Sequence, residues 1–183
     1  LPYGSQSEEL RVWDEEFVVA GDDLVHAREK ALMAVTPIAA RYYGDLADGR
    51  GEATLSYERT WSGELSAALR DELRRDVQRG YSTVGPHRDD VLIQLDGRDA
   101  RRQASQGEQR SLALALLLAG DALVRDQRKI TPLLMLDDVF SELDPLRSTR
   151  LLTLLPSGQT LVTAAAPLPT DLLPAHVVDV TRR

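Results

Sequence analysis

The fold is decided by residues 133–138, which read Leu-Leu-Met-Leu-Asp-Asp. A continuous apolar run of this length predicts a buried strand of a parallel sheet. Because the run ends in carboxylates, they are placed at the C-terminal edge of that sheet, where α/β proteins bind ligands. Asp137 then suits Mg²⁺ beside nucleotide phosphates, and Asp138 suits orientation or deprotonation of an attacking water. The alternative interpretation is a strand that ends in a solvated acidic turn.

A loop, a helix and a second strand follow the carboxylates. Residues 141–145 read Ser-Glu-Leu-Asp-Pro, in which Asp144 suits the N-cap of a helix over 145–155 and the proline its first position. Residues 160–163 are again apolar, so the order strand, helix, strand predicts a right-handed βαβ crossover in a parallel sheet. A last strand is expected over 176–180.

Upstream, residues 104–111 read Ala-Ser-Gln-Gly-Glu-Gln-Arg-Ser and precede an apolar stretch, 112–118, that predicts a buried helix. Exposed backbone N–H groups, a serine hydroxyl and the positive end of a helix dipole suit a triphosphate. The simpler alternative is a helix start closed by a capping box between Ser105 and Glu108.

The apolar spacing from Ser5 to Tyr43 predicts a long amphipathic helical arm that begins at a capping box of Ser5 and Glu8. Gly21 and Pro37 are expected to interrupt or kink it. The expected packing stripe consists of Leu10, Trp13, Phe17, Leu24, Ala27, Ala31, Val35, Ile38 and Tyr42.

Shorter elements are expected after the arm. Residues 53–57 alternate as a half-buried strand does, and residues 65–77 form an amphipathic helix that Gly80 closes. A strand over 91–95 and the Asp96-Gly97 turn predict a hairpin.

Taken together, these segments resemble an ABC-type ATPase head: a signature loop at 104–111, a buried helix, a Walker B strand and a D-loop at 141–145. Within that superfamily they resemble RecF-type proteins most closely. The features that carry this are Ser-Gln-Gly at 105–107, the Asp137-Asp138 pair, Gly-Pro-His-Arg-Asp-Asp at 85–90, and the arm pattern of Trp13-Asp14, Gly21 and Arg28.

The resemblance implies the fold class α/β, as the C-terminal part of an ABC-type ATPase head with a parallel-sheet βαβ core and a helical arm or lobe. Residues 5–80 would form the arm and a segment like lobe II, and residues 81–183 the C-terminal ATPase subdomain. No Gly-x-x-x-x-Gly-Lys-Ser/Thr loop occurs in the sequence, so the chain by itself cannot cradle the β- and γ-phosphates.

The resemblance also implies a function and a set of site residues. In RecF-type proteins, ATP held between two subunits closes a homodimer on DNA and hydrolysis reopens it, at single-strand gaps and junctions, with RecR helping to direct loading of RecA. A weak DNA-dependent ATPase is expected for a full-length protein and none for this chain alone. The residues implied are Asp137 for Mg²⁺, Asp138 for catalysis, and Ser105, Gln106, Gly107, Glu108, Ser141 and Asp144 for ATP.

Composition limits the other possibilities. The 22 basic and 29 acidic residues give a net charge of −7, so the chain is a poor free-standing DNA binder and any DNA contact should use a local patch. A membrane span needs about 20 apolar residues, longer than any run present, and a cytoplasmic location is expected.

Other functions remain open at this point. The chain is also compatible with another SMC-like or RecN-like ATPase head, which would carry very long coiled-coil arms. A non-enzymatic partner-binding module with vestigial nucleotide motifs is a second alternative, and a transporter ATPase subunit a more distant third. The cluster at 86–90 is interpreted as a hydrogen-bonded surface turn leading into a strand, and a general base, a metal site or a phosphate contact is the alternative. The arginines around the signature are interpreted as a solvated face, and contact with nucleotide, DNA or a partner is the alternative. They are Arg98, Arg101, Arg102 and Arg110.

Overall fold

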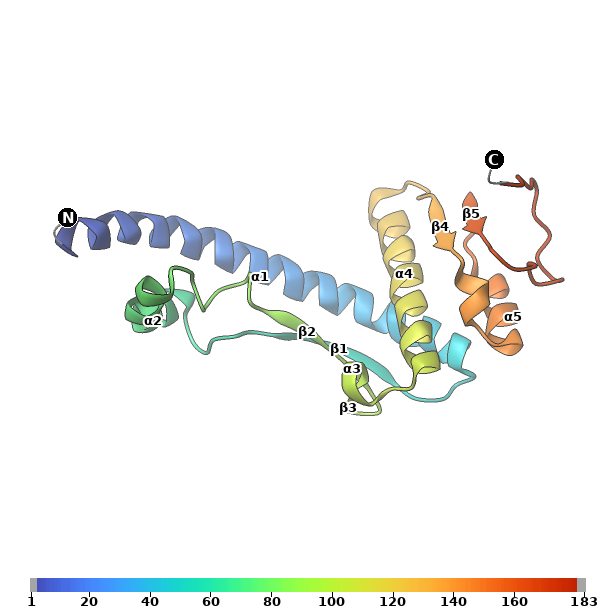
Figure 1. Cartoon of the computed structure of the whole chain (residues 1–183), viewed down its shortest axis with the longest axis horizontal. Coiled ribbons are helices and arrows are strands. Elements are labelled where there is room, and N and C mark those ends of the chain that lie inside the picture. The colour runs from blue at the N-terminus through green and yellow to red at the C-terminus, as the bar shows by residue number, and fades with distance from the viewer. Residues whose placement is uncertain (1–2, 181–183) are drawn as a thin grey trace. The chain divides into compact units, whose positions relative to one another are not determined.

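The computed structural model describes residues 3–180, with side chains from residue 15 onward. In chain order the elements are α1 Tyr3–Ala47, β1 Ala53–Glu58, α2 Leu65–Arg79, β2 Asp90–Leu95, β3 Arg98–Asp99, α3 Ala100–Gln103, α4 Gln106–Arg128, β4 Leu134–Asp137, the 3-10 turn η1 Val139–Glu142, α5 Pro145–Leu154 and β5 Thr160–Thr163 (Figure 1). No helix in the described part of the chain is long and apolar enough to cross a membrane.

The chain divides into two compact units. The first combines Leu1–Thr36 with Thr54–Ile93, and the second combines Pro37–Ala53 with Gln94–Arg183. Helix α1 and strands β1 and β2 therefore contribute residues to both units. The expected division into an arm and lobe over 5–80 and an ATPase subdomain over 81–183 stays a prediction.

The expected interruption of the arm is wrong. Helix α1 runs unbroken from Tyr3 to Ala47, with Pro37 inside it. Next to the proline, which has no N–H to donate, the hydroxyl of Thr36 donates to the carbonyl oxygen of Leu32 at 2.7 Å. The capping box expected at Ser5 and Glu8 lies outside the described side chains.

The packing stripe of α1 also differs from the expected one where side chains are described, a range that leaves out the expected Leu10 and Trp13. The expected Phe17 and Leu24 are 37% and 43% exposed, whereas Val25 is 4% exposed and Gly21 is buried. A Cβ atom on Gly21 would lie 2.7 Å from Cδ2 of Leu65, which is itself buried. The missing side chain is therefore what allows the close approach, and a glycine gives no hydrophobic signal by which a stripe is located.

In the first unit, α2 supplies a small apolar core. Its buried members are Leu65, Leu69 and Val84, with Val18, Trp61 and Ala68 packed against them. The helix ends as expected: Gly80 is left-handed, with φ 76°, and its N–H donates to the carbonyl oxygen of Asp76. The expected strand at 53–57 is confirmed as β1.

The turn before β2 is held by a polar network within the first unit. The carboxylate of Asp89 accepts from the Tyr57 hydroxyl at 2.6 Å and from the N–H of Thr60 at 2.9 Å. Arg28 donates to the carbonyl oxygen of Pro86 at 2.6 Å and to the Tyr57 hydroxyl at 3.1 Å. Burial, followed by the hydrogen bond to Asp89, raises the pKa of Tyr57. These contacts are those of a hydrogen-bonded turn leading into a strand, as the sequence interpretation favoured.

Strands β1, β2 and β3 form one sheet in that order, and the hairpin expected at Asp96-Gly97 is confirmed. Strands β2 and β3 pair antiparallel, with Gln94 opposite Asp99. Asp96 and Gly97 both have positive φ, 50° and 74°, as a tight two-residue hairpin turn requires.

The core of the second unit contains a parallel pair, β4 and β5, joined through α5 (Figure 1). This confirms the expected strand, helix, strand order. Leu134 and Leu136 are each 3% exposed, while Met135 is 64% and its register partner Leu161 50% exposed. One face of the pair is therefore covered and the other is open and apolar. The last strand expected at 176–180 is wrong, since the structure has no strand there.

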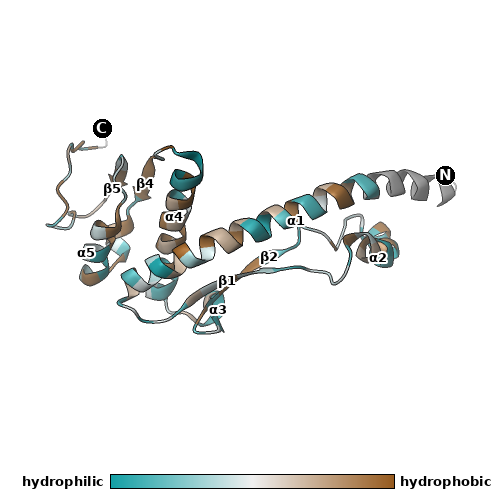
Figure 2. Cartoon of the chain, turned by 180° about the vertical axis from the view of Figure 1, so that it is seen from behind, coloured by the Kyte–Doolittle hydropathy of each residue, from teal (hydrophilic) through white to brown (hydrophobic). Residues whose placement is uncertain are grey.

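Helix α4 lies beside β4 in both views and is apolar along its middle (Figures 1 and 2). The residues that it buries are Ser111, Leu112, Leu114, Ala115, Leu118 and Ala119. Leu117 is 44% exposed, so α4 has a buried face and an open one. The buried helix expected over 112–118 is therefore buried on one face in the described chain, with Leu117 on the exposed face.

Candidate functional site

The signature segment forms the start of α4, with Ser105 as N-cap. The Ser105 hydroxyl accepts from the N–H of Glu108 at 3.3 Å. In return, the backbone N–H and the hydroxyl of Ser105 donate to Oε2 of Glu108 at 2.7 and 2.8 Å. The expected capping box is confirmed. It fixes a first turn whose amides, at Gln106 and Gly107, belong to the group that a helix start leaves without intrahelical acceptors.

Ionisation of Glu108 is coupled to this turn. The hydrogen bonds from the backbone N–H and then the hydroxyl of Ser105 hold the pKa of Glu108 below its usual value. Because the folded-state pKa is the lower one, the box contributes stability above the unfolded pKa, about 4.3, and loses it as the pH falls through the folded pKa.

We therefore expect the melting temperatures of the wild type and of Glu108→Gln to converge as the pH is lowered from 7 to 3. Glutamine keeps the capping geometry without the charge, so only the ionic part of the box is removed. Thermal melts at each pH measure the difference. A gap that stays constant over this range would show that the charge of Glu108 does not stabilise the turn.

Gly107 is contacted by Ser111 on one side and by Arg147 on the other. The hydroxyl of Ser111, which is fully buried, donates to the Gly107 carbonyl oxygen at 2.9 Å. On its other side, Gly107 contacts the guanidinium of Arg147, and a side chain at this position would overlap Nη1 of that arginine. Tyr43, near the C-terminal end of α1, is 2% exposed, and the charges of Glu108 and Arg147 act on its hydroxyl. Burial, and then the charge of Glu108, raises the pKa of Tyr43.

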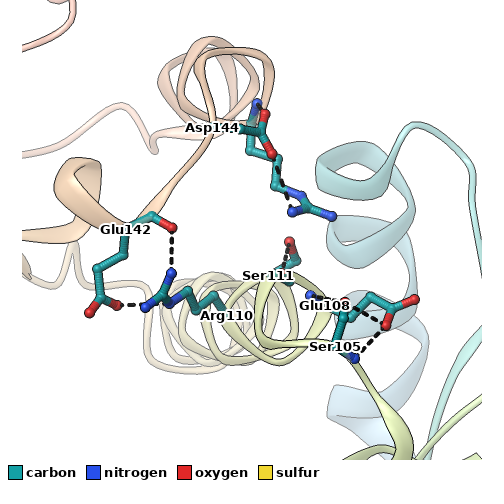
Figure 3. A network of polar contacts seen from close by, with 8 residues as sticks. Ser105, Glu108, Arg110, Ser111, Glu142 and Asp144 are labelled. Carbon is teal, nitrogen blue, oxygen red and sulfur yellow. Dashed lines mark hydrogen bonds and ion pairs between the residues drawn. The ribbon is translucent and has the colours of Figure 1, made fainter.

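The D-loop, residues 141–145, is joined to the start of α4 (Figure 3). Arg110 of α4 donates from Nη1 to the carbonyl oxygen of Glu142 at 2.9 Å, and its Nε lies 3.2 Å from Oε2 of the same residue. Asp144 caps α5 as expected, accepting from the N–H of Arg147 at 2.9 Å, and its Oδ2 lies 3.2 Å from Nη1 of Arg147. The structure thus brings the signature and the D-loop of one chain together.

The two carboxylates after β4 lie at the end of the β4–β5 pair. Thr163, the register partner of Asp137, donates its hydroxyl to Oδ1 of that carboxylate. Asp138 has a left-handed backbone, φ 46°, and its N–H donates to the carbonyl oxygen of Thr163 at 3.0 Å. Its Oδ2 accepts from the Ser141 hydroxyl at 2.9 Å, and its Oδ1 from the N–H of Ala165 at 3.3 Å. Asp138 is therefore fixed to the first residue of the D-loop.

The donor set at this edge consists of carboxylate and hydroxyl oxygens, which are the hard ligands that Mg²⁺ prefers. Among the described residues there is no group of three or more His, Cys, Asp or Glu that would hold a metal alone. Asp137 offers one such carboxylate, so a cation held there would take its remaining ligands from water or from a bound molecule.

Sequence reasoning missed several residues of this region. Thr163 has a readable signal, because it ends the parallel strand next to Asp137. Arg147 has none, since its partner Gly107 is 40 positions away in the printed sequence. The arginines interpreted as a solvated face take separate partners: Arg98 lies 3.8 Å from Asp96, and Arg102 lies 3.5 Å from Asp99. Arg110 forms an ion pair with Glu142 of the D-loop.

The sequence is similar to curated proteins described as DNA replication and repair protein RecF. It is 41% identical over 167 residues to that of Streptomyces avermitilis, covering 85% of this chain and 44% of the relative. It is 37% identical over 155 residues to that of Lachnoclostridium phytofermentans, covering 84% and 43%. For Frankia alni the values are 40% over 182 residues, covering 89% and 48%. The chain thus spans less than half the length of these relatives. No protein-family model matches the chain.

The fold is also similar to solved structures of the recombination mediator protein RecF in the RecFOR pathway. The structure described as RecF-ATP matches with a TM-score of 0.75 and 25% identity, covering 91% of this chain and 46% of that one. The structure described as RecF-ATPrS matches with a TM-score of 0.74 and 25% identity, covering 87% and 46%. The expected fold class, an α/β segment of an ABC-type ATPase head with a parallel β-sheet and several helices, is confirmed.

Proposed function

We propose a function from one premise: this chain is the counterpart of the C-terminal part of RecF proteins. It supplies half of each ATP site in a DNA-binding clamp of recombinational repair and replication. The clamp acts at single-strand gaps and junctions, together with RecR-like partners, to promote loading of RecA. The observation that carries this proposal is the joined set of signature turn, D-loop and carboxylate pair on one chain that has no phosphate-binding loop.

The signature turn is proposed to bind the γ-phosphate of a nucleotide held by a second subunit. Ser105, Gln106 and Gly107 offer a hydroxyl and amides at the positive end of the dipole of α4. Glu108 would not touch the phosphates, since like charges repel. Its role is to hold Ser105 in place through the capping box, and the Ser105 hydroxyl must turn away from Glu108 to donate to an anion.

The carboxylate pair is proposed to serve the nucleotide of its own subunit. Asp137 would hold Mg²⁺, which would supply positive charge to offset the charge that develops on the phosphates. Asp138 would orient the attacking water from a position fixed by Ser141 and the N–H of Ala165. Because Ser141 belongs to the D-loop and donates to Asp138, contact of that loop with a partner subunit would change the position of the Asp138 carboxylate. Ser141 and Asp144 are therefore proposed as coupling residues of the site.

Two further features support a chain that works as part of a larger head. The exposed apolar pair Met135 and Leu161 leaves one face of a parallel pair open, whereas parallel sheets are normally covered on both faces. The net charge of −7 disfavours binding of this chain to DNA phosphates. DNA contact would therefore need a local basic patch or surfaces of other parts of the protein.

The test compares this chain alone with a full-length protein in which it is joined to a phosphate-binding loop. We expect the chain alone to show no saturable ATP-Mg²⁺ binding by calorimetry, because the β- and γ-phosphates lack their cradle. The full-length protein is expected to bind ATP and to dimerise with it, as sedimentation would show. Micromolar affinity of the chain alone would contradict the half-site proposal. A full-length protein that ignores ATP would favour a partner-binding module with vestigial motifs.

A further inference from the structure

We propose that Arg110 and Arg147 are positioning residues that clamp the signature turn to the D-loop of the same chain. The two segments would then meet the nucleotide and the D-loop of a partner subunit as one pre-assembled piece. This inference rests on the proposed function, since it concerns how the in-trans half of the ATP site is held.

Arg110 forms the first arm of the clamp. Its guanidinium reaches from the second turn of α4 to Glu142, where it contacts both the backbone carbonyl and the carboxylate (Figure 3). A planar fork can satisfy two acceptors of different direction at once, which a lysine ammonium does less well. The contact with the carbonyl oxygen matters most, because it fixes the backbone of the D-loop and not merely the position of a side chain.

Arg147 forms the second arm and runs in the opposite direction. It rises from the first turn of α5, is oriented by Asp144, and places its guanidinium against Gly107. Its side chain is 26% exposed, so most of it is packed. Glycine is required at position 107 for this contact, because a side chain would displace the guanidinium. The buried hydroxyl of Ser111 holds the same glycine from below.

The polar contacts of Arg110 with Glu142 and the packing of Arg147 on Gly107 run in opposite directions, so together they restrain both the distance and the rotation between the segments. Segments ordered before binding lose less conformational entropy when the partner arrives. The expected effect of breaking the clamp is therefore on association of the subunits. Binding of ATP to the phosphate loop of a single subunit does not use these arginines.

The experiment uses the full-length protein with its phosphate-binding loop. Arg110→Met removes the charge and the donors but keeps an unbranched apolar stem. Arg128→Met, at the far end of α4, is the matched control, because it is the same change on the same helix, about 27 Å away along the axis. We expect ATP-dependent dimerisation to weaken roughly tenfold in Arg110→Met, and ATP affinity of the single subunit to stay within about twofold. The control should leave both unchanged.

Conservative and paired variants separate positioning from general stability. Arg110→Lys should recover part of the dimerisation, because it keeps the charge but not the fork. Arg147→Met should weaken dimerisation in the same way, and the double variant should lose less than the product of the single losses, since one broken arm already frees the D-loop. Arg110→Lys also remains informative should the methionine variant fold poorly.

The inference is overturned if both methionine variants dimerise like Arg128→Met. It is also overturned if dimerisation falls only in proportion to a lowered melting temperature. A wild-type protein that binds ATP without dimerising would overturn the proposed in-trans site, and with it the clamp. A wild type that dimerises, with variants that dimerise equally well, overturns the clamp alone.

Discussion

In a full-length protein that contains this chain, Ser105→Arg is expected to weaken ATP-driven dimerisation by roughly a hundredfold or more, equivalent to about 3 kcal/mol. Arginine has no acceptor for the N–H of Glu108, so the capping box is lost, and N-cap losses alone cost about 1 kcal/mol of helix stability. The larger cause is steric. The long side chain would fill the space before the first-turn amides, where the partner's γ-phosphate is proposed to lie.

ATP binding to the single subunit should be nearly intact, because the cradle for the β- and γ-phosphates belongs to another part of the protein. Sedimentation with a slowly hydrolysed ATP analogue measures the dimer, and calorimetry measures binding. Ser105→Thr keeps a capping hydroxyl and should behave like the wild type. Ser157→Arg places the same long side chain on an exposed loop position and is the steric control. Normal dimerisation of Ser105→Arg would show that this turn does not face a partner's nucleotide.

Local signals explain what was predictable in this fold. Ser105 with Glu108, and Asp144 before Pro145, are caps whose partners lie within three residues, so the sequence itself contains both halves of each interaction. The apolar stretches of β4 and β5 are equally local, and their parallel pairing follows from the helix between them. These elements contain most of the predicted site residues, although the roles of those residues remain proposals.

Interactions between distant positions explain what was missed. Arg110 and Glu142 are 32 residues apart, and nothing in either segment indicates that a guanidinium will contact a particular backbone carbonyl. The buried stripe of α1 was predicted at the wrong residues for a related reason. Gly21 is part of it because Leu65 of α2 leaves no space for a side chain at position 21. The strand expected at 176–180 would need a neighbour to pair with. The described chain offers none in a ladder with it, so its apolar residues lie exposed.

Asp138→Asn is expected to lower ATP turnover in the full-length protein by roughly a hundredfold or more, the scale on which a positioned acid or base acts. Asparagine is the right substitution for a structural reason. Residue 138 has φ 46°, a left-handed conformation that asparagine adopts about as readily as aspartate and that alanine resists. The amide also keeps an oxygen for the hydroxyl of Ser141 or the N–H of Ala165. The loss then reports the missing charge and not a collapsed loop.

With hydrolysis slowed and the signature turn intact, the ATP-bound dimer of Asp138→Asn should outlive that of the wild type. Phosphate release and dimer decay, followed in parallel, measure the two effects. Asp126→Asn is the matched control, because this aspartate of α4 forms an ion pair with Lys129, the C-cap of the helix, and has no proposed role. Asp137→Asn should differ from both by needing more Mg²⁺ to reach the same turnover. If Asp138→Asn hydrolyses ATP within about threefold of the control, the attacking water is positioned by another group, and Asp138 serves only to anchor the D-loop through Ser141.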